Sequence, residues 1–85
     1  MPPEKRQSDL DRAEADALRQ AASDSFAALQ IAHLRYEHGL KIVEEGGLSA
    51  EAAVAIRQRG REYAEAVTTY SNAAMAWLAF MEKIK

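Results

Sequence analysis

The two histidines, His33 and His38, are the side chains of this sequence best suited to metal binding or acid–base chemistry. They stand five residues apart, so on one helix their side chains would point about 140° away from each other. A single helix therefore cannot offer both to one metal ion. Because buried polar groups find hydrogen-bond partners, we expect His33 to be a neutral core residue bonded to a hydroxyl. A bundle containing such a buried histidine would be sensitive to pH.

Carboxylates are plentiful, but their spacing does not predict a metal centre. Helical di-iron proteins use Glu-x-x-His motifs on facing helices. Here Glu62 and Glu65 are three residues apart with no histidine beside them, and Glu37 adjoins His38 without sharing its face. The serines and threonines show no nucleophile motif, and cysteine is absent. We therefore expect no catalytic residue, no cofactor and no metal ligand, and we predict that the protein is not an enzyme.

Three arginines, Arg57, Arg59 and Arg61, form the only basic cluster of the sequence. Arg61 stands four residues before Glu65, so the two side chains can pair on a solvated, salt-bridged helix face. The alternative interpretation is a contact with phosphate or RNA. Small antiparallel hairpin dimers of the plasmid copy-number regulator type bind paired RNA loops, and the architecture predicted below is similar to theirs. The net charge of −2 favours the salt-bridged face.

Residues 1–7 contain both prolines of the chain and have no apolar face, so we expect a disordered leader there. Ser8 is a suitable N-cap for the helix that follows, because its side chain can accept a bond from a free backbone N–H. The first helix is predicted over residues 8–45, where strong helix formers dominate.

The two adjacent glycines Gly46 and Gly47 provide a stop for the first helix, and we predict a turn over residues 46–49. Ser49 would cap a second helix over residues 50–84. Because the link between the two helices is short, they should fold back on each other as an antiparallel, all-α hairpin.

Apolar residues of the second helix repeat at alternating steps of three and four, which is the heptad seam of a helix that packs against a partner helix. Its positions are Ala53, Ile56, Gly60, Tyr63, Val67, Tyr70, Ala74, Trp77, Met81 and Ile84. The first helix has a matching seam of Ala22, Phe26, Leu29, His33, Tyr36, Leu40 and Val43. The aromatic residues lie on these seams, so we expect them to pack in the core rather than to line a ligand pocket.

Folding the chain at Leu48 brings the two seams into register. Tyr36 then faces Gly60, which explains a glycine inside a helix by the space that the tyrosine ring needs. The same register pairs His33 with Tyr63 and Phe26 with Tyr70. Toward the N-terminus, the first seam extrapolates to residues that fit a core less well, Arg19, Ala15 and Arg12.

A second apolar stripe runs along the first helix, on a face about 140° from its seam. A lone hairpin can cover only one of the two stripes, and an exposed apolar patch of this kind marks an interface. We therefore predict a homodimer that forms a four-helix bundle, with another helical protein as the alternative partner. The predicted interface residues are Ala27, Ile31, Leu34, Ile42, Leu78 and Phe80.

These features predict a small interaction or assembly module, of adaptor, chaperone or immunity type, that acts as an oligomer. Two alternatives stay open: an RNA-binding dimer that uses Arg57, Arg59 and Arg61, and a secreted helical hairpin of a bacterial secretion system. The longest apolar run, over residues 73–81, is too short to span a bilayer. The lack of cysteine and of a signal-peptide pattern is compatible with the cytoplasm, and the Ala- and Arg-rich usage suggests a GC-rich bacterial source.

Overall fold

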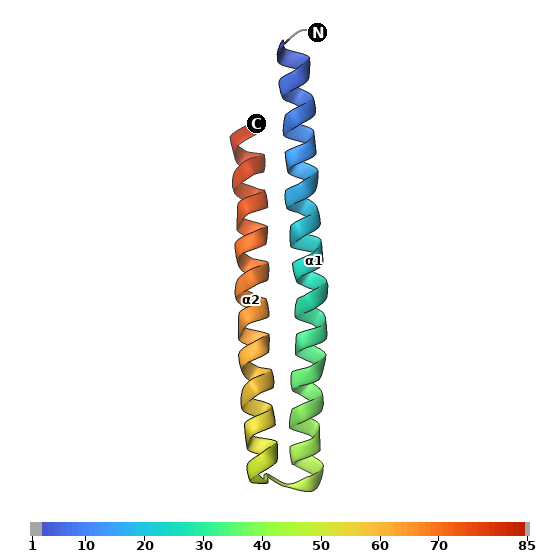
Figure 1. The fold of residues 1–85 in the computed structure, drawn as a ribbon, viewed down its shortest axis with the longest axis vertical. Helices are drawn as coiled ribbons and strands as arrows, with labels where there is room; N and C mark the ends of the chain where they lie inside the picture. The colour runs from blue at the N-terminus through green and yellow to red at the C-terminus, as the bar shows by residue number, and fades with distance from the viewer. Residues whose placement is uncertain (1–2, 85) are drawn as a thin grey trace.

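The chain forms two long α-helices that lie side by side in antiparallel order (Figure 1). The computed structural model describes residues 3–84, and the side chains of residues 7–84. The helix α1 spans Pro3–Gly46 and the helix α2 spans Ala50–Ile84, and together they make a rod of 67 × 15 × 14 Å. The predicted all-α helical hairpin is thereby confirmed.

The first helix begins at Pro3, earlier than the N-cap expected at Ser8. Residues 3–7, where we expected a leader without structure, are therefore helical, while residues 1–2 lie outside the described residues. The physical reason is that proline suits the first helical position, where its missing N–H has no partner to lose. The residues that follow it are Glu, Lys, Arg and Gln, all strong helix formers.

The turn is built by one glycine and one serine, as the sequence predicted. Gly47 has a φ of +83°, and its N–H donates to the carbonyl of Val43 at 2.7 Å, which closes the end of α1. The hydroxyl of Ser49 accepts a hydrogen bond from the N–H of Ala52 at 3.0 Å and caps the start of α2. A left-handed residue and an N-cap within three positions turn the chain back on itself.

Substitutions in the turn should have opposite effects at its two glycines. Gly47→Ala should lower the free energy of unfolding by about 1 kcal/mol, because a side chain is strained at positive φ. Gly46→Ala should raise it by up to about 1 kcal/mol, since alanine is the better helix former, and nothing lies within 4 Å of the added Cβ. Urea unfolding followed by circular dichroism measures both at one protein concentration, and equal shifts would contradict this turn geometry.

Contacts between the helices follow the predicted register. A Cβ added at Gly60 would lie 3.3 Å from Cε1 of Tyr36, so the tyrosine ring occupies the space that glycine leaves. The ring centroids of Phe26 and Tyr70 are 5.3 Å apart, and so are those of His33 and Tyr63. In each pair the two residue numbers add up to 96, so one register holds from Phe26 to Tyr36.

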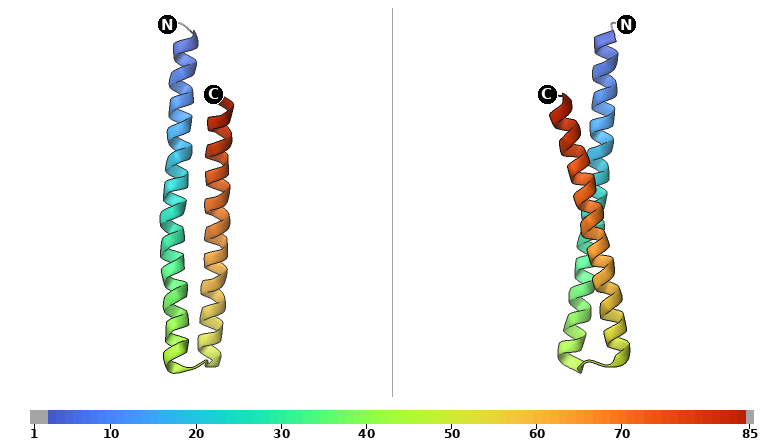
Figure 2. Two further views of the ribbon diagram at one scale, coloured as in Figure 1. Left: turned by 180° about the vertical axis from the view of Figure 1, so that it is seen from behind. Right: turned by 90° about the vertical axis from the view of Figure 1, so that its left-hand side faces the viewer.

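The core of the hairpin is a single line of contacts between the helices. Within residues 7–84, Ala22 is the one buried apolar residue, with 6% of its surface exposed. Figure 2 shows the two helices crossing in the side view, as expected of helices that coil around a heptad seam. Two helices cannot enclose a side chain from every direction, so the rest of the seam stays partly open to solvent.

Candidate functional site

The histidine on the seam is not the buried residue that we expected. The ring of His33 packs near Tyr63, but its Nε2 lies 3.1 Å from Oε1 of Glu37, one turn along the same helix. Its side chain is 45% exposed, and its polar partner is a carboxylate rather than a hydroxyl. The expectation was wrong because two helices leave one edge of this ring open, where an i,i+4 carboxylate can reach it. His38 is exposed on the outer side of α1.

Three hydroxyl groups of the hairpin form hydrogen bonds with the backbone of the helices. Ser25 Oγ and Thr68 Oγ1 each donate to the backbone carbonyl four residues earlier, at 2.8 and 3.1 Å, and Ser49 caps α2. Within the described residues, no group of three His, Asp or Glu side chains is placed to hold a metal ion.

The arginine cluster divides between different sides of α2. Arg59 crosses to α1, where its Nη1 donates to the backbone carbonyl of Arg35 at 3.1 Å. Gly39 leaves the space for this contact, since a Cβ there would lie 3.2 Å from the same nitrogen. Arg35 in turn pairs with Glu62, with 3.3 Å between Nη1 and Oε2. Arg59 is thus part of the packing between the helices, which its spacing along α2 alone did not reveal.

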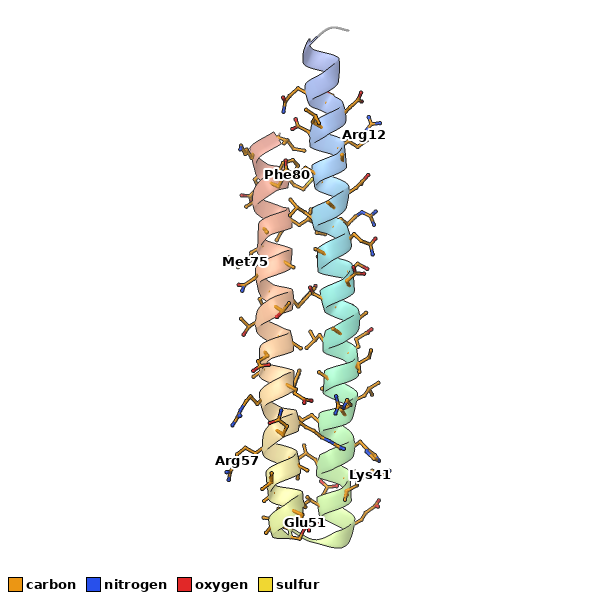
Figure 3. The ribbon with its side chains drawn as sticks, in the orientation of Figure 1. Arg12, Lys41, Glu51, Arg57, Met75 and Phe80 are labelled. Carbon is orange, nitrogen blue, oxygen red and sulfur yellow. The ribbon has the colours of Figure 1, made fainter. Side chains whose placement is uncertain are left out.

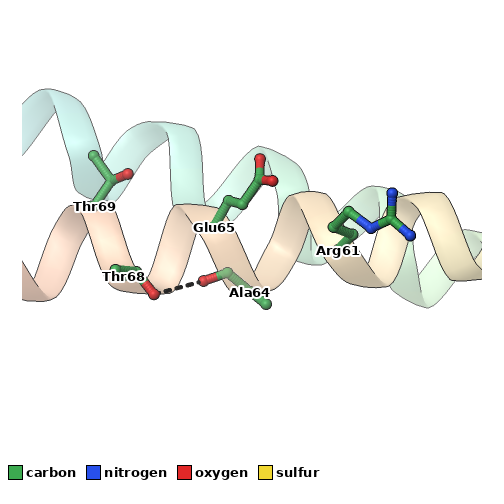
Figure 4. A pocket seen from close by; sticks show the side chains of 5 residues that line it. All are labelled: Arg61, Ala64, Glu65, Thr68 and Thr69. Atoms are coloured by element: carbon green, nitrogen blue, oxygen red, sulfur yellow. Dashed lines mark hydrogen bonds between the residues drawn. The ribbon is translucent and has the colours of Figure 1, made fainter.

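The other two arginines stay on the outside of α2, and Figure 3 shows Arg57 pointing away from α1. The ion pair expected between Arg61 and Glu65 is not one of the two ion pairs formed within residues 7–84. Instead, both residues border a shallow surface depression on α2 (Figure 4), lined by Arg61, Ala64, Glu65, Thr68 and Thr69. A phosphate group would therefore meet the guanidinium groups of Arg57 and Arg61 separately, and the carboxylate of Glu65 lies beside Arg61.

Four of the predicted interface residues, Ala27, Ile31, Leu34 and Ile42, lie on the side of α1 that faces away from α2. Leu34 lies about 100° around the helix from the seam residue His33 and about 160° from the seam residue Tyr36, so it faces away from α2. Ile31 and Leu34 are 60% and 64% exposed, and Ile42 is 48% exposed. We call this set the outer stripe; it has no partner within the hairpin.

The other two predicted interface residues lie elsewhere. Phe80 is near the open end of the rod, close to the level of Arg12, whereas Lys41 lies toward the turn (Figure 3). Two residues of separation place Leu78 and Phe80 on opposite sides of α2, about 35 Å along the rod from Ile42. The hairpin does not bring the six residues into one surface.

A groove that we did not predict opens between the helices toward the open end. It has a volume of about 230 Å³ and is lined by Arg19, Ala22, Ser23, Phe26, Tyr70 and Trp77. The signal for it in the sequence was Arg19, a seam position occupied by a long charged side chain that cannot fill a core. The groove therefore has an apolar, largely aromatic floor and a guanidinium group at its edge.

Neither helix, within residues 3–84, has a stretch long and apolar enough to cross a membrane. Comparison with protein-family models, with curated proteins and with solved structures found no match to this chain. The argument for function therefore depends on the surfaces of the hairpin.

Proposed function

We propose that this protein is a small, non-catalytic interaction module that works as an oligomer through protein–protein contact. The observation that supports this proposal is the apolar surface that the hairpin leaves uncovered. Within residues 7–84, twelve large apolar side chains are exposed, whereas one apolar residue is buried. Among them Ile31, Leu34 and Ile42, of the outer stripe, follow one face of α1, and apolar surface gathered on one face marks a site of protein contact.

The exposed area gives the size of the missing contact. The chain exposes 6623 Å², whereas a compact monomer of its mass would expose roughly 5,000 Å². The excess, about 1,600 Å² per chain, is about twice what each partner buries in a standard protein interface and falls in the range of obligate dimers. A second hairpin is the simplest partner of the right size, and two hairpins make a four-helix bundle.

The RNA-binding alternative has weaker support. Arg59 is engaged between the helices, and Glu65 lies beside Arg61, so the cluster does not offer one continuous basic face. No observation favours the secreted alternative. A cysteine-free chain suits a reducing cytoplasm, where we propose that the module works.

Light scattering behind size-exclusion chromatography tests the proposal. We expect a mass twice that of the chain at micromolar concentration, falling toward the monomer on dilution. A helical monomer at every concentration would contradict self-association and would leave another protein as the partner. The same measurement, repeated with RNA present at 50 mM and at 500 mM salt, separates this function from the RNA-binding alternative. A complex with RNA would lose affinity steeply between the two salt concentrations.

A further inference from the structure

The outer stripe is centred on a row of residues that points directly away from α2, which we call the central row. Ile31 stands two positions from each of the seam residues Leu29 and His33, so its side chain points about 160° from both. Steps of seven residues keep this direction along a helix that coils with its partner. The central row consists of six exposed residues: Leu10, Ala17, Asp24, Ile31, His38 and Glu45.

Two flanking rows run beside the central row and are exposed as well. Between residues 13 and 42 they are Ala13, Gln20, Ala27, Leu34 and Lys41 on one side, and Glu14, Ala21, Ala28, Arg35 and Ile42 on the other. Between residues 17 and 34 the three rows carry a single charge, the carboxylate of Asp24. Between residues 35 and 42 their charged and titratable side chains are all basic, namely Arg35, His38 and Lys41.

A second α1 that crosses antiparallel at Ile31 would match the apolar residues of the outer stripe by size. Ile31 then meets Ile31 of the other chain. In two antiparallel helices a flanking row meets the same row of the other helix, so Leu34 lies beside Ala27, and Ile42 lies beside Ala21. The pairing of large side chains with small ones is what close packing of two helices requires.

The same crossing matches the charges of the two chains. Each Asp24 carboxylate would meet the imidazole of His38 of the other chain, with Arg35 and Lys41 one turn away on either side. Within residues 7–84, Asp24 takes part in no ion pair and accepts one hydrogen bond, from Nε2 of Gln20 at 2.8 Å. A carboxylate can accept from further donors.

Other arrangements of two α1 helices lose this match. A copy in parallel order and register would set Asp24 against Asp24, and the basic residues against each other. An antiparallel copy shifted by one heptad would set Asp24 against Ile31 or against Glu45, depending on the direction of the shift. In the crossing at Ile31, the like-charged neighbours are Glu14 and Glu45, at the solvent-exposed ends of the contact, where salt screens their repulsion.

We propose that the outer stripe binds a second copy of this chain, with the two α1 helices antiparallel and crossing at Ile31. The inference rests on the proposed function, because it names the surface and the order of that self-association. The pattern favours a copy over another protein, since a two-fold interface sets one surface against itself and therefore needs a self-complementary row. The two α1 helices would then lie at the centre of the four-helix assembly.

Single cysteines test the arrangement directly, because the natural chain has no cysteine. Gln20→Cys and Lys41→Cys, mixed and oxidised, should form a disulfide-linked dimer, since these positions of one flanking row face each other within the reach of a disulfide, about 7 Å between Cα atoms. Each variant alone should stay unlinked, because about 30 Å of helix then separates the two cysteines. Met75→Cys, at an exposed residue of α2, is the matched control and should also stay unlinked.

A charge at the crossing gives a second, independent measurement. Ile31→Asp should raise the dimer dissociation constant, measured by sedimentation equilibrium, at least about tenfold, because it sets two carboxylates against each other in the contact. Met75→Asp makes the corresponding change at an exposed apolar residue of α2 and should leave the constant nearly unchanged. Circular dichroism should show equal helix content in both variants.

The outcomes separate this inference from the proposed function. A mixture of Gln20→Cys and Lys41→Cys that does not link, or an Ile31→Asp variant that behaves like Met75→Asp, would overturn the inference while the natural chain still forms its oligomer and the proposed function stands. A natural chain that stays monomeric would overturn both.

Discussion

Replacing Tyr63 by alanine should destabilise the hairpin by about 3 kcal/mol, which for a chain of this size lowers the melting temperature by roughly 15 °C. Tyr63 is the residue at which the most rings meet. Its centroid lies 5.3 Å from that of His33 and 5.8 Å from that of Tyr36. The substitution therefore removes two aromatic contacts, each worth about 0.5–1.5 kcal/mol, in addition to the apolar area of the ring.

Met75→Ala is the control for this experiment, because Met75 is a large apolar residue of the same helix but is exposed. It should change the melting temperature by a few degrees at most, since alanine is also a good helix former. Both variants should be melted at one protein concentration, because the stability of an oligomer depends on it. Similar losses in the two variants would contradict the position of Tyr63 at the centre of the seam.

The second large effect is expected at Gly60. Gly60→Leu should cost about 2 kcal/mol, because the new side chain must displace the ring of Tyr36, whose Cε1 lies 3.3 Å from the position of an added Cβ. In a Tyr36→Ala background the same leucine should cost much less or stabilise the hairpin, since it fills the space that the ring has left. Urea unfolding of the four variants measures the coupling between the two positions.

Ala64→Leu provides the reference for adding a leucine to α2 without a facing ring, because Ala64 is exposed. It should change the free energy of unfolding by less than about 0.5 kcal/mol. Additive effects of Gly60→Leu and Tyr36→Ala, with no coupling, would show that the two positions are not in contact.

The fold could be predicted from the sequence because apolar periodicity determines it directly. A register error of one heptad would place Tyr36 away from Gly60, so the pairing of the large residue with the small one selects one register. The turn could also be predicted from the sequence, because a left-handed position and an N-cap need specific residue types, which Gly47 and Ser49 supply.

The choice of polar partners could not be predicted in the same way. His33 pairs with Glu37, and Glu62 pairs with Arg35, although each has several charged neighbours within reach. Exposed ion pairs differ by less than about 1 kcal/mol, so spacing along a helix does not rank them. Arg59 was missed for a related reason, because its partner is a carbonyl on the other helix and depends on the space at Gly39.

Both described ends of the chain, at Pro3 and Ile84, lie at the same end of a 67 Å rod, opposite the turn (Figure 1). Tension applied between them would load the seam contacts one after another, starting with the pair nearest the open end. The helices would then separate one layer of contacts at a time, because no two layers resist the force together. A hairpin held by its two ends is thus mechanically weak, whereas the same hairpin pulled between its turn and its open end carries the load along both helices at once.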